Sequence, residues 1–210
     1  MLLLYDCTTA PSPRRARILL AEKGAVHDTV QVDLRNGEQL GDAYRRINPQ
    51  CTVPALRTDD GMLLTDNAGI TAYLEARFPQ PALLGEAPLE KAEIASWNWR
   101  IEFEGLLAVA DALRNSAPSM AHRALPGPMD YAQIPELAQR GLARIQQFLV
   151  SLNDRLARRE FIATDRFSIA DITAVVAVDF ARVVKLKPGE QHPHLLRWRA
   201  EMAKRPSMSL

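Results

Sequence analysis

The sequence predicts an α/β domain with a small mixed sheet, followed by an all-α domain. Two observations support this fold class. Short strand-like and helix-like segments alternate in the first part of the chain, and only helical periodicity follows a proline-rich stretch around Pro79 and Pro81. We therefore expect domains at residues 1–79 and 89–210, joined by a linker at residues 80–88.

The first domain is expected to contain four strands and three helices in the order βαβαββα. Its strands are predicted at residues 2–5, 29–33, 53–57 and 62–64, and its helices at residues 13–23, 38–47 and 67–78. The Asp60-Gly61 pair predicts a tight hairpin between the last two strands. Ser12 followed by Pro13 is typical of a helix start, so we expect Ser12 to be an N-cap.

In the second domain we expect helices at residues 90–115, 134–158, 168–184 and 195–204. The segment 168–184 is apolar nearly all round, which predicts the buried central helix of the domain. Ser168 and Asp171 have the spacing of a capping box, in which each side chain bonds the main chain of the other residue. We interpret this pair as a folding device and not as a catalytic one.

Composition excludes several classes of protein. The 210 residues carry a net charge of +1, which argues against nucleic acid or an anionic membrane as the main partner. No apolar run reaches the length of a membrane span, and the apolar start of the chain lacks the features of a signal peptide. Cys7 and Cys51 do not form a disulfide framework, so we expect a cytoplasmic location. The four histidines are scattered, and we assign no metal site.

A proline at an unusual place suggests a binding site. Pro54 follows Val53 where a strand should begin, and proline lacks the N–H that a strand interior needs. Asp66-Asn67 then forms a good helix start twelve residues later. Pro54 alone would be read as an ordinary turn proline, but the two features together imply two nearby clusters of free main-chain N–H groups. Such clusters suit a small peptide.

Four motifs in this order make the whole chain resemble the cytosolic glutathione S-transferase family. They are Asn48-Pro49 with Val53-Pro54, the Asp66-Asn67 pair, the proline-rich linker, and Ser168-x-x-Asp171. The resemblance implies a thioredoxin-like first domain that binds glutathione and a helical second domain that supplies the pocket for an electrophile. It also implies a homodimer.

The resemblance assigns roles to several residues. It implies that the N–H and C=O of Val53 pair with the cysteinyl part of glutathione, and that a cis peptide bond before Pro54 exposes them. The N–H and amide of Asn67 would hold the γ-glutamyl carboxylate, and Asp66 would meet the α-amino group. Two weaker candidates for the glycyl end are Gln39 and Thr52.

Glutathione reacts as a thiolate, so the site must lower the pKa of its thiol from about 8.5. A shift of two units requires roughly 2.7 kcal/mol. One hydrogen bond to the charged sulfur supplies roughly 1.5–3 kcal/mol, so a single hydroxyl near the first helix suffices. Ser12 is one candidate, but Ala10 and Pro11 stand where the serine of serine-type members often lies. Thr9 is the other candidate, and the plain reading of Ser12 as an N-cap stays open.

The sequence indicates no catalytic role for either cysteine. Cys7 follows the first strand directly, earlier than the catalytic cysteine of some family members, and we expect it to be a small buried apolar residue. Cys51 stands where the family usually has glycine.

The predicted function is therefore the activation of glutathione, either to attack small electrophiles or to reduce peroxides and disulfides. Both reactions need the same thiolate. An alternative is a noncatalytic binding protein of the stringent-starvation-protein type, which the displaced serine favours and the intact Val53-Pro54 motif opposes. A maleylacetoacetate isomerase is less favoured, because the Ser-Ser-Cys run of that family is absent.

Overall fold

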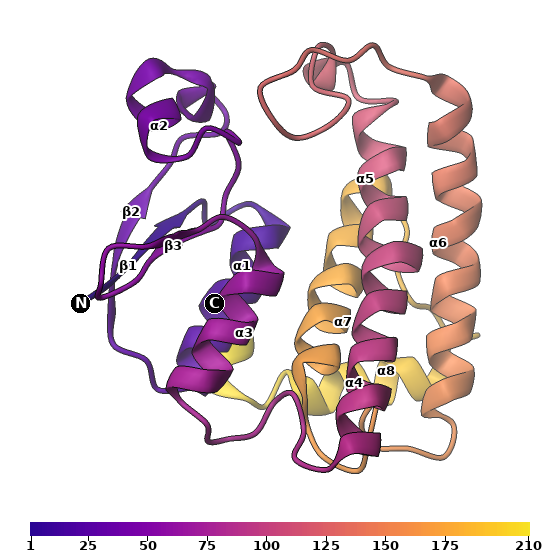
Figure 1. The fold of residues 1–210 in the computed structure, drawn as a ribbon. Helices are drawn as coiled ribbons and strands as arrows, with labels where there is room; N and C mark the ends of the chain where they lie inside the picture. Colours follow the sequence, from indigo (N-terminus) through magenta and orange to yellow (C-terminus); the bar gives the residue numbers. More distant parts are fainter. The chain divides into compact units, whose positions relative to one another are not determined.

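The computed structural model describes residues 1–210 as two compact units. The first unit comprises Met1–Pro81, Leu125–Asp130 and Leu210, and it contains the sheet. The second comprises Ala82–Ala124 and Tyr131–Ser209, and it is helical. Figure 1 colours the chain from indigo at the N-terminus to yellow at the C-terminus.

The first unit has the predicted βαβαββα order. Its elements are β1 (Leu2–Asp6), α1 (Pro11–Glu22), β2 (His27–Gln31), a 3₁₀ turn (Glu38–Leu40), α2 (Asp42–Ile47), β3 (Ala55–Arg57), β4 (Leu63–Leu64) and α3 (Asn67–Arg77). The sheet order is β2-β1-β3-β4, with β1 and β2 parallel and the other pairs antiparallel. The thioredoxin-like fold class is thus confirmed.

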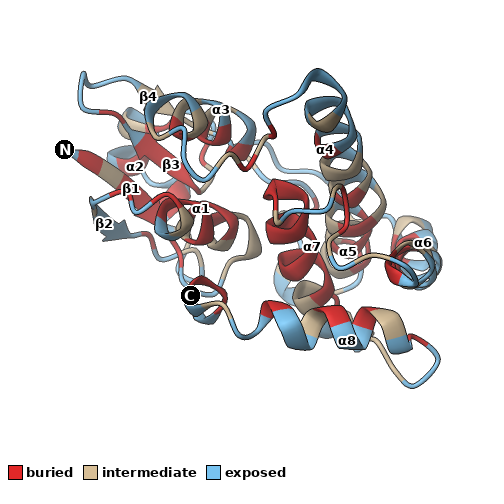
Figure 2. Cartoon of the chain, turned by 90° about the horizontal axis from the view of Figure 1, so that it is seen from below, coloured by how far each residue is buried: buried red, intermediate tan, exposed pale blue.

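Alternate residues of the strands supply a core beneath α2. Tyr5 of β1 and Ala55 of β3 pack with Val32 and with Tyr44 of α2, and the two tyrosine rings meet edge to face at 6.0 Å. The helices α1 and α3 pack against each other. The edge strand β2 is largely exposed, whereas β1, β3 and one face of α1 are buried (Figure 2).

Two predicted elements of the first unit differ in detail. The single helix expected at residues 38–47 is divided, because Gly41 is extended (φ −75°, ψ 154°) and starts α2 anew. The second strand lies two residues earlier than expected. Gly24 ends α1 in the left-handed region (φ 58°), and the parallel register then places His27 opposite Leu2.

The second unit consists mainly of helices. In chain order they are α4 (Pro88–Arg100), a π-helical segment (Ile101–Leu106), α5 (Leu107–Arg114), a 3₁₀ turn (Pro118–Met120), α6 (Pro135–Leu156), α7 (Ile169–Phe180), a 3₁₀ turn (Ala181–Val184), α8 (Pro193–Met202) and a last 3₁₀ turn (Pro206–Ser209). Each residue of α7 from Ile169 to Val178 is buried, as predicted for the buried helix of this domain.

The capping box at the start of α7 is present. Asp171 Oδ2 accepts hydrogen bonds from the N–H and Oγ of Ser168, at 3.1 and 3.2 Å. Its Oδ1 accepts from the N–H of Ile162 and from Nε1 of Trp198, at 3.0 and 3.1 Å. Burial raises the pKa of Asp171 to about 6, although these four donors favour the ionised form. The Asp171 carboxylate therefore joins α7 to Trp198 of α8 and to Ile162 in the segment before α7.

We expect Asp171→Ala to lower the free energy of unfolding by roughly 2–4 kcal/mol, because it leaves buried donors without acceptors. Urea denaturation measures this change. Asp165→Ala, which alters a fully exposed carboxylate, is the matched control. An Asp171→Ala protein as stable as the control would contradict the assignment.

The raised pKa of Asp171 also predicts a pH dependence of stability. Between about pH 4 and pH 6 the folded state binds the proton more tightly than the unfolded state does, so stability falls as pH rises through this window. The shift corresponds to about 3 kcal/mol. Asp171→Asn removes this titration and should flatten the curve relative to wild type, whereas Asp165→Asn should not. Equal slopes for all three proteins in urea titrations would refute the expectation.

Candidate functional site

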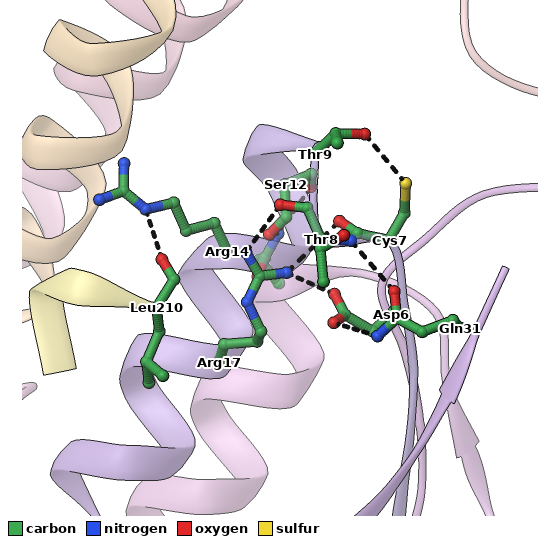
Figure 3. A network of polar contacts seen from close by, with 10 residues as sticks. Asp6, Cys7, Thr8, Thr9, Ser12, Arg14, Arg17, Gln31 and Leu210 are labelled. Carbon is green, nitrogen blue, oxygen red and sulfur yellow. Dashed lines mark hydrogen bonds and ion pairs between the residues drawn. The ribbon is translucent and has the colours of Figure 1, made fainter. Parts of the chain in front are cut away.

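The site begins with a buried ion pair at the end of β1. Asp6 is only 1% exposed. Its Oδ1 lies 2.5 Å from Nη1 of Arg17, and its Oδ2 accepts a hydrogen bond of 2.8 Å from Nε2 of Gln31 (Figure 3). The carboxylate therefore links β1, α1 and β2.

The same side chains hold the loop between β1 and α1. Arg17 donates to the carbonyl oxygens of Cys7 and Thr8, at 3.3 and 3.2 Å. Gln31 Oε1 accepts from the N–H of Thr8 at 3.2 Å, so both main-chain polar groups of Thr8 are bonded (Figure 3). No local pattern in the sequence predicts this support. A charged residue directly after a buried strand was the available signal, but its partners lie 11 and 25 residues away.

The expectation that Ser12 is an N-cap is wrong. The helix α1 begins at Pro11 with Ala10 as its N-cap, and no side chain caps it. Pro11 already has the φ of a first helical residue and has no N–H to satisfy, so Ser12 becomes the second residue of the helix. Its hydroxyl instead meets Asn67, whose Nδ2 lies 2.8 Å from Ser12 Oγ and 3.1 Å from its carbonyl oxygen. The structure thus brings together two predicted site residues that lie 55 positions apart.

Thr9, the other candidate hydroxyl, lies in the loop before α1. It is exposed, and its Oγ1 is 3.5 Å from the sulfur of Cys7 (Figure 3). Cys7 itself is buried, in keeping with the predicted small apolar role.

Val53 leads into β3 with an unpaired main chain. The Val53–Pro54 peptide bond is cis. The pairing of β1 with β3 ends at Tyr5 and Ala55, and the N–H and C=O of Val53 form no hydrogen bond within the protein.

The residue before it is held firmly. The carbonyl oxygen of Thr52 accepts from Tyr44 Oη at 2.8 Å and from Asn48 Nδ2 at 2.9 Å. Burial raises the pKa of Tyr44 to about 12, so this phenol is a neutral donor. Asn48 Nδ2 also lies 3.3 Å from Thr52 Oγ1. The carbonyl oxygen and the hydroxyl oxygen of Thr52 are therefore bonded to the protein, whereas its main-chain N–H has no acceptor there.

Two neighbouring residues have unusual surroundings. Gln39 is 5% exposed, and its Oε1 has no hydrogen-bond partner. Cys51 is buried with φ 55°, a left-handed conformation that favours glycine. This conformation explains why glycine suits that position in the family that the chain resembles.

The start of α3 presents free donors. Asp66 is its N-cap, and Oδ1 of that side chain accepts from the N–H of Gly69 at 2.8 Å. Asp66 thus caps the helix through Oδ1, and Oδ2 of this exposed residue has no hydrogen bond within the protein. The N–H groups of Asn67 and Ala68 have no acceptor, as expected in a first helical turn. Because the Asn67 amide nitrogen bonds Ser12, the main-chain N–H is the donor of Asn67 that remains open to a ligand.

Further features bear on what the chain can do. No group of three or more His, Cys, Asp or Glu side chains lies close enough together to hold a metal ion. None of the helices combines the length and apolar character that crossing a bilayer demands.

The geometry above agrees with the comparisons with known proteins. The model of the glutathione S-transferase N-terminal domain matches residues 9–77, and that of the C-terminal domain matches residues 117–206.

Individual relatives extend over nearly the whole chain. Glutathione S-transferase 2 of Saccharomyces cerevisiae is 34% identical to this chain, in an alignment that covers 99% of this chain and 88% of the yeast protein. The crystal structure of Gtt2 from Saccharomyces cerevisiae has a TM-score of 0.88 at 33% identity, covering 99% of this chain and 98% of its own. A glutathione S-transferase domain-containing protein of Marinobacter aquaeolei VT8 also has a TM-score of 0.88, at 38% identity, covering 98% of this chain and 99% of its own. This chain belongs to the glutathione S-transferase family.

Proposed function

We propose that the chain is an enzyme that binds glutathione and activates its thiol for attack on small electrophiles or for the reduction of peroxides and disulfides. Residues 1–79 bind glutathione, and residues 89–210 supply the electrophile pocket. The observation that carries the proposal is the unpaired main chain of Val53, which lies beside a cis proline in the same unit as the open start of α3. The names of the relatives support the same activity.

Each part of glutathione has a complementary group. The N–H and C=O of Val53 pair with the cysteinyl residue, as a strand would, and Pro54 shapes this segment. The N–H groups at the start of α3 bind the γ-glutamyl carboxylate, because a helix N-terminus attracts anions. The exposed Oδ2 of Asp66 meets the α-amino group.

The glycyl end has weaker partners. Gln39 offers a buried side-chain amide, whose Nε2 donates to the glycyl carboxylate and whose unsatisfied Oε1 accepts from the glycyl N–H. Thr52 has its carbonyl group bonded to the protein, so its hydroxyl proton and its main-chain N–H remain to contribute.

The thiolate is stabilised at the start of α1. Ser12 lies in the first turn of that helix, where the helix dipole favours a negative charge by roughly 0.3–1 kcal/mol. A hydrogen bond from its hydroxyl to the sulfur adds roughly 1.5–3 kcal/mol. Thr9, on the exposed loop before the helix, is the second candidate for this bond. The thiolate then attacks the electrophile, or it is oxidised as a peroxide or disulfide is reduced.

Nothing in the structure or among these relatives favours the noncatalytic binding protein. We also propose that the enzyme acts in the cytoplasm. Both cysteines are free thiols, which suits a reducing compartment.

A homodimer forms part of the proposal. Trp99 and Phe103 stack with ring centroids 5.6 Å apart, yet they are 60% and 48% exposed. Leu107, one helical turn further along, is also about half exposed. Exposed apolar side chains in such a row are typical of a protein–protein interface. We therefore place the contact with a second copy at this row.

Wild-type protein should be retained on immobilised glutathione and should lower the pKa of the bound thiol by about two units from its free value. Ser12→Ala should raise this pKa by about one to two units, because it removes one hydrogen bond to the sulfur. Titration of the thiolate absorbance measures both values, and Thr9→Ala is the matched hydroxyl deletion.

If the pKa of the bound thiol rises in Thr9→Ala and not in Ser12→Ala, then Thr9 is the residue that stabilises the thiolate. If neither change moves it, a main-chain N–H or a water stabilises the thiolate. Absence of retention by wild type would refute the glutathione-binding function.

For the dimer, Trp99→Ser should weaken self-association at least roughly tenfold, as the loss of a large aromatic anchor does at other interfaces. Analytical ultracentrifugation measures the dissociation constant. Leu196→Ser, at an exposed apolar residue of α8, should leave it unchanged. Equal effects of the two changes would argue against an interface at Trp99.

A further inference from the structure

We propose that Asn67 is a positioning residue that directs the hydroxyl proton of Ser12 toward the sulfur of glutathione. The inference rests on the proposed function and deepens it. It assigns the side chain of Asn67 to the chemistry at sulfur, and it leaves the binding of the γ-glutamyl carboxylate to the main chain.

The first step is the orientation of the Asn67 amide. One of its terminal atoms lies 3.1 Å from the carbonyl oxygen of Ser12 and 2.8 Å from Ser12 Oγ. A carbonyl oxygen only accepts hydrogen bonds, so the atom that faces it must be the donating nitrogen. The opposite amide orientation would set two acceptor oxygens against each other. The carbonyl group of Ser12 therefore identifies the atom as Nδ2.

The second step concerns the direction of the Ser12 hydroxyl. Because Nδ2 of Asn67 can only donate, Ser12 Oγ is the acceptor in the 2.8 Å bond. The hydroxyl proton must then point away from Asn67. No acceptor for this proton is found within the protein, so it remains available to a ligand.

The third step is the rigidity of the arrangement. Asn67 is buried, although it is the first residue of α3, and Ser12 is the second residue of α1. The two bonds join the starts of two helices that pack against each other. Nδ2 of Asn67 is engaged by the carbonyl oxygen and the hydroxyl of Ser12, so it is not available to a carboxylate. Its main-chain N–H, which no side-chain change removes, keeps that task.

These steps separate the effects of substitutions at residue 67. Asn67→Ala frees the Ser12 hydroxyl to rotate and should raise the pKa of the bound thiol, with little change in KM for glutathione. Asn67→Asp replaces the donor by an acceptor that captures the Ser12 proton. In this variant the pKa of the bound thiol should rise by as much as in Ser12→Ala, about one to two units.

The test is a double-mutant cycle on the thiolate titration, with Asn67→Ala made in wild type and in Ser12→Ala. If Asn67 acts through Ser12, its replacement by alanine raises the thiol pKa in wild type and has no effect once the hydroxyl is absent. Asn67→Asp in the Ser12→Ala protein measures the effect of the new charge alone, which is then subtracted. Thr65→Ala, which lies two residues before Asn67 and alters a side chain without a hydrogen bond, is the control, and melting temperatures verify that each variant is folded.

Equal effects of Asn67→Ala in both backgrounds would overturn the inference, and so would a thiol pKa that stays at its wild-type value. In both cases wild type still binds glutathione and lowers the thiol pKa, so the proposed function stands. A wild-type protein that leaves the thiol pKa unchanged would overturn the proposed function and this inference with it.

Discussion

The first unit depends on one buried carboxylate. Asp6 lies at the end of the central strand β1, and an ionised group there is stable only because Arg17 and Gln31 satisfy both of its oxygens. The same two residues bond the main chain of the following loop. The charge pair thus sets the path of the chain into α1, which places Ser12 in the first helical turn.

In the first unit, some main-chain polar groups near the candidate site are hydrogen-bonded to the protein, and others are open. Thr52 is held by Tyr44 and Asn48, whereas the next residue, Val53, has no partner within the protein. Buried main-chain polar groups are nearly always paired, and the half-buried main chain of Val53 is not, so this segment beside a strand is suited to receive a ligand. The open donors at the start of α3 follow the same rule. Main-chain groups are thus bonded at Thr52 and open at Val53 and at the start of α3, where we propose that glutathione binds.

The second unit has its own buried carboxylate, with a different task. Asp171 accepts four hydrogen bonds, and these tie the central helix α7 to Trp198 of α8 and to Ile162. Burial raises the pKa of the Asp171 carboxyl group, and we assign this group a structural role and no catalytic one.

The sequence by itself determined the element order, the two-part architecture, the central helix and its capping box. These features follow from periodicity, turn residues and caps, which act within a few residues of each other. It also pointed to Val53, Asp66 and Asn67, since proline and helix-start residues have local meaning.

Tertiary structure alone decided how those residues are used. The Ser12–Asn67 bond, the grip of Arg17 on the loop and the π-helical segment at Ile101–Leu106 involve partners distant in sequence or the packing of whole helices. The prediction that Ser12 caps α1 is wrong partly for the same reason. Pro11 starts the helix, and the Ser12 hydroxyl is bonded to Asn67 of α3. Local patterns state what a residue can do. Only the folded chain determines which neighbour its hydrogen bond reaches, because that bond depends on distances between elements that no local spacing encodes.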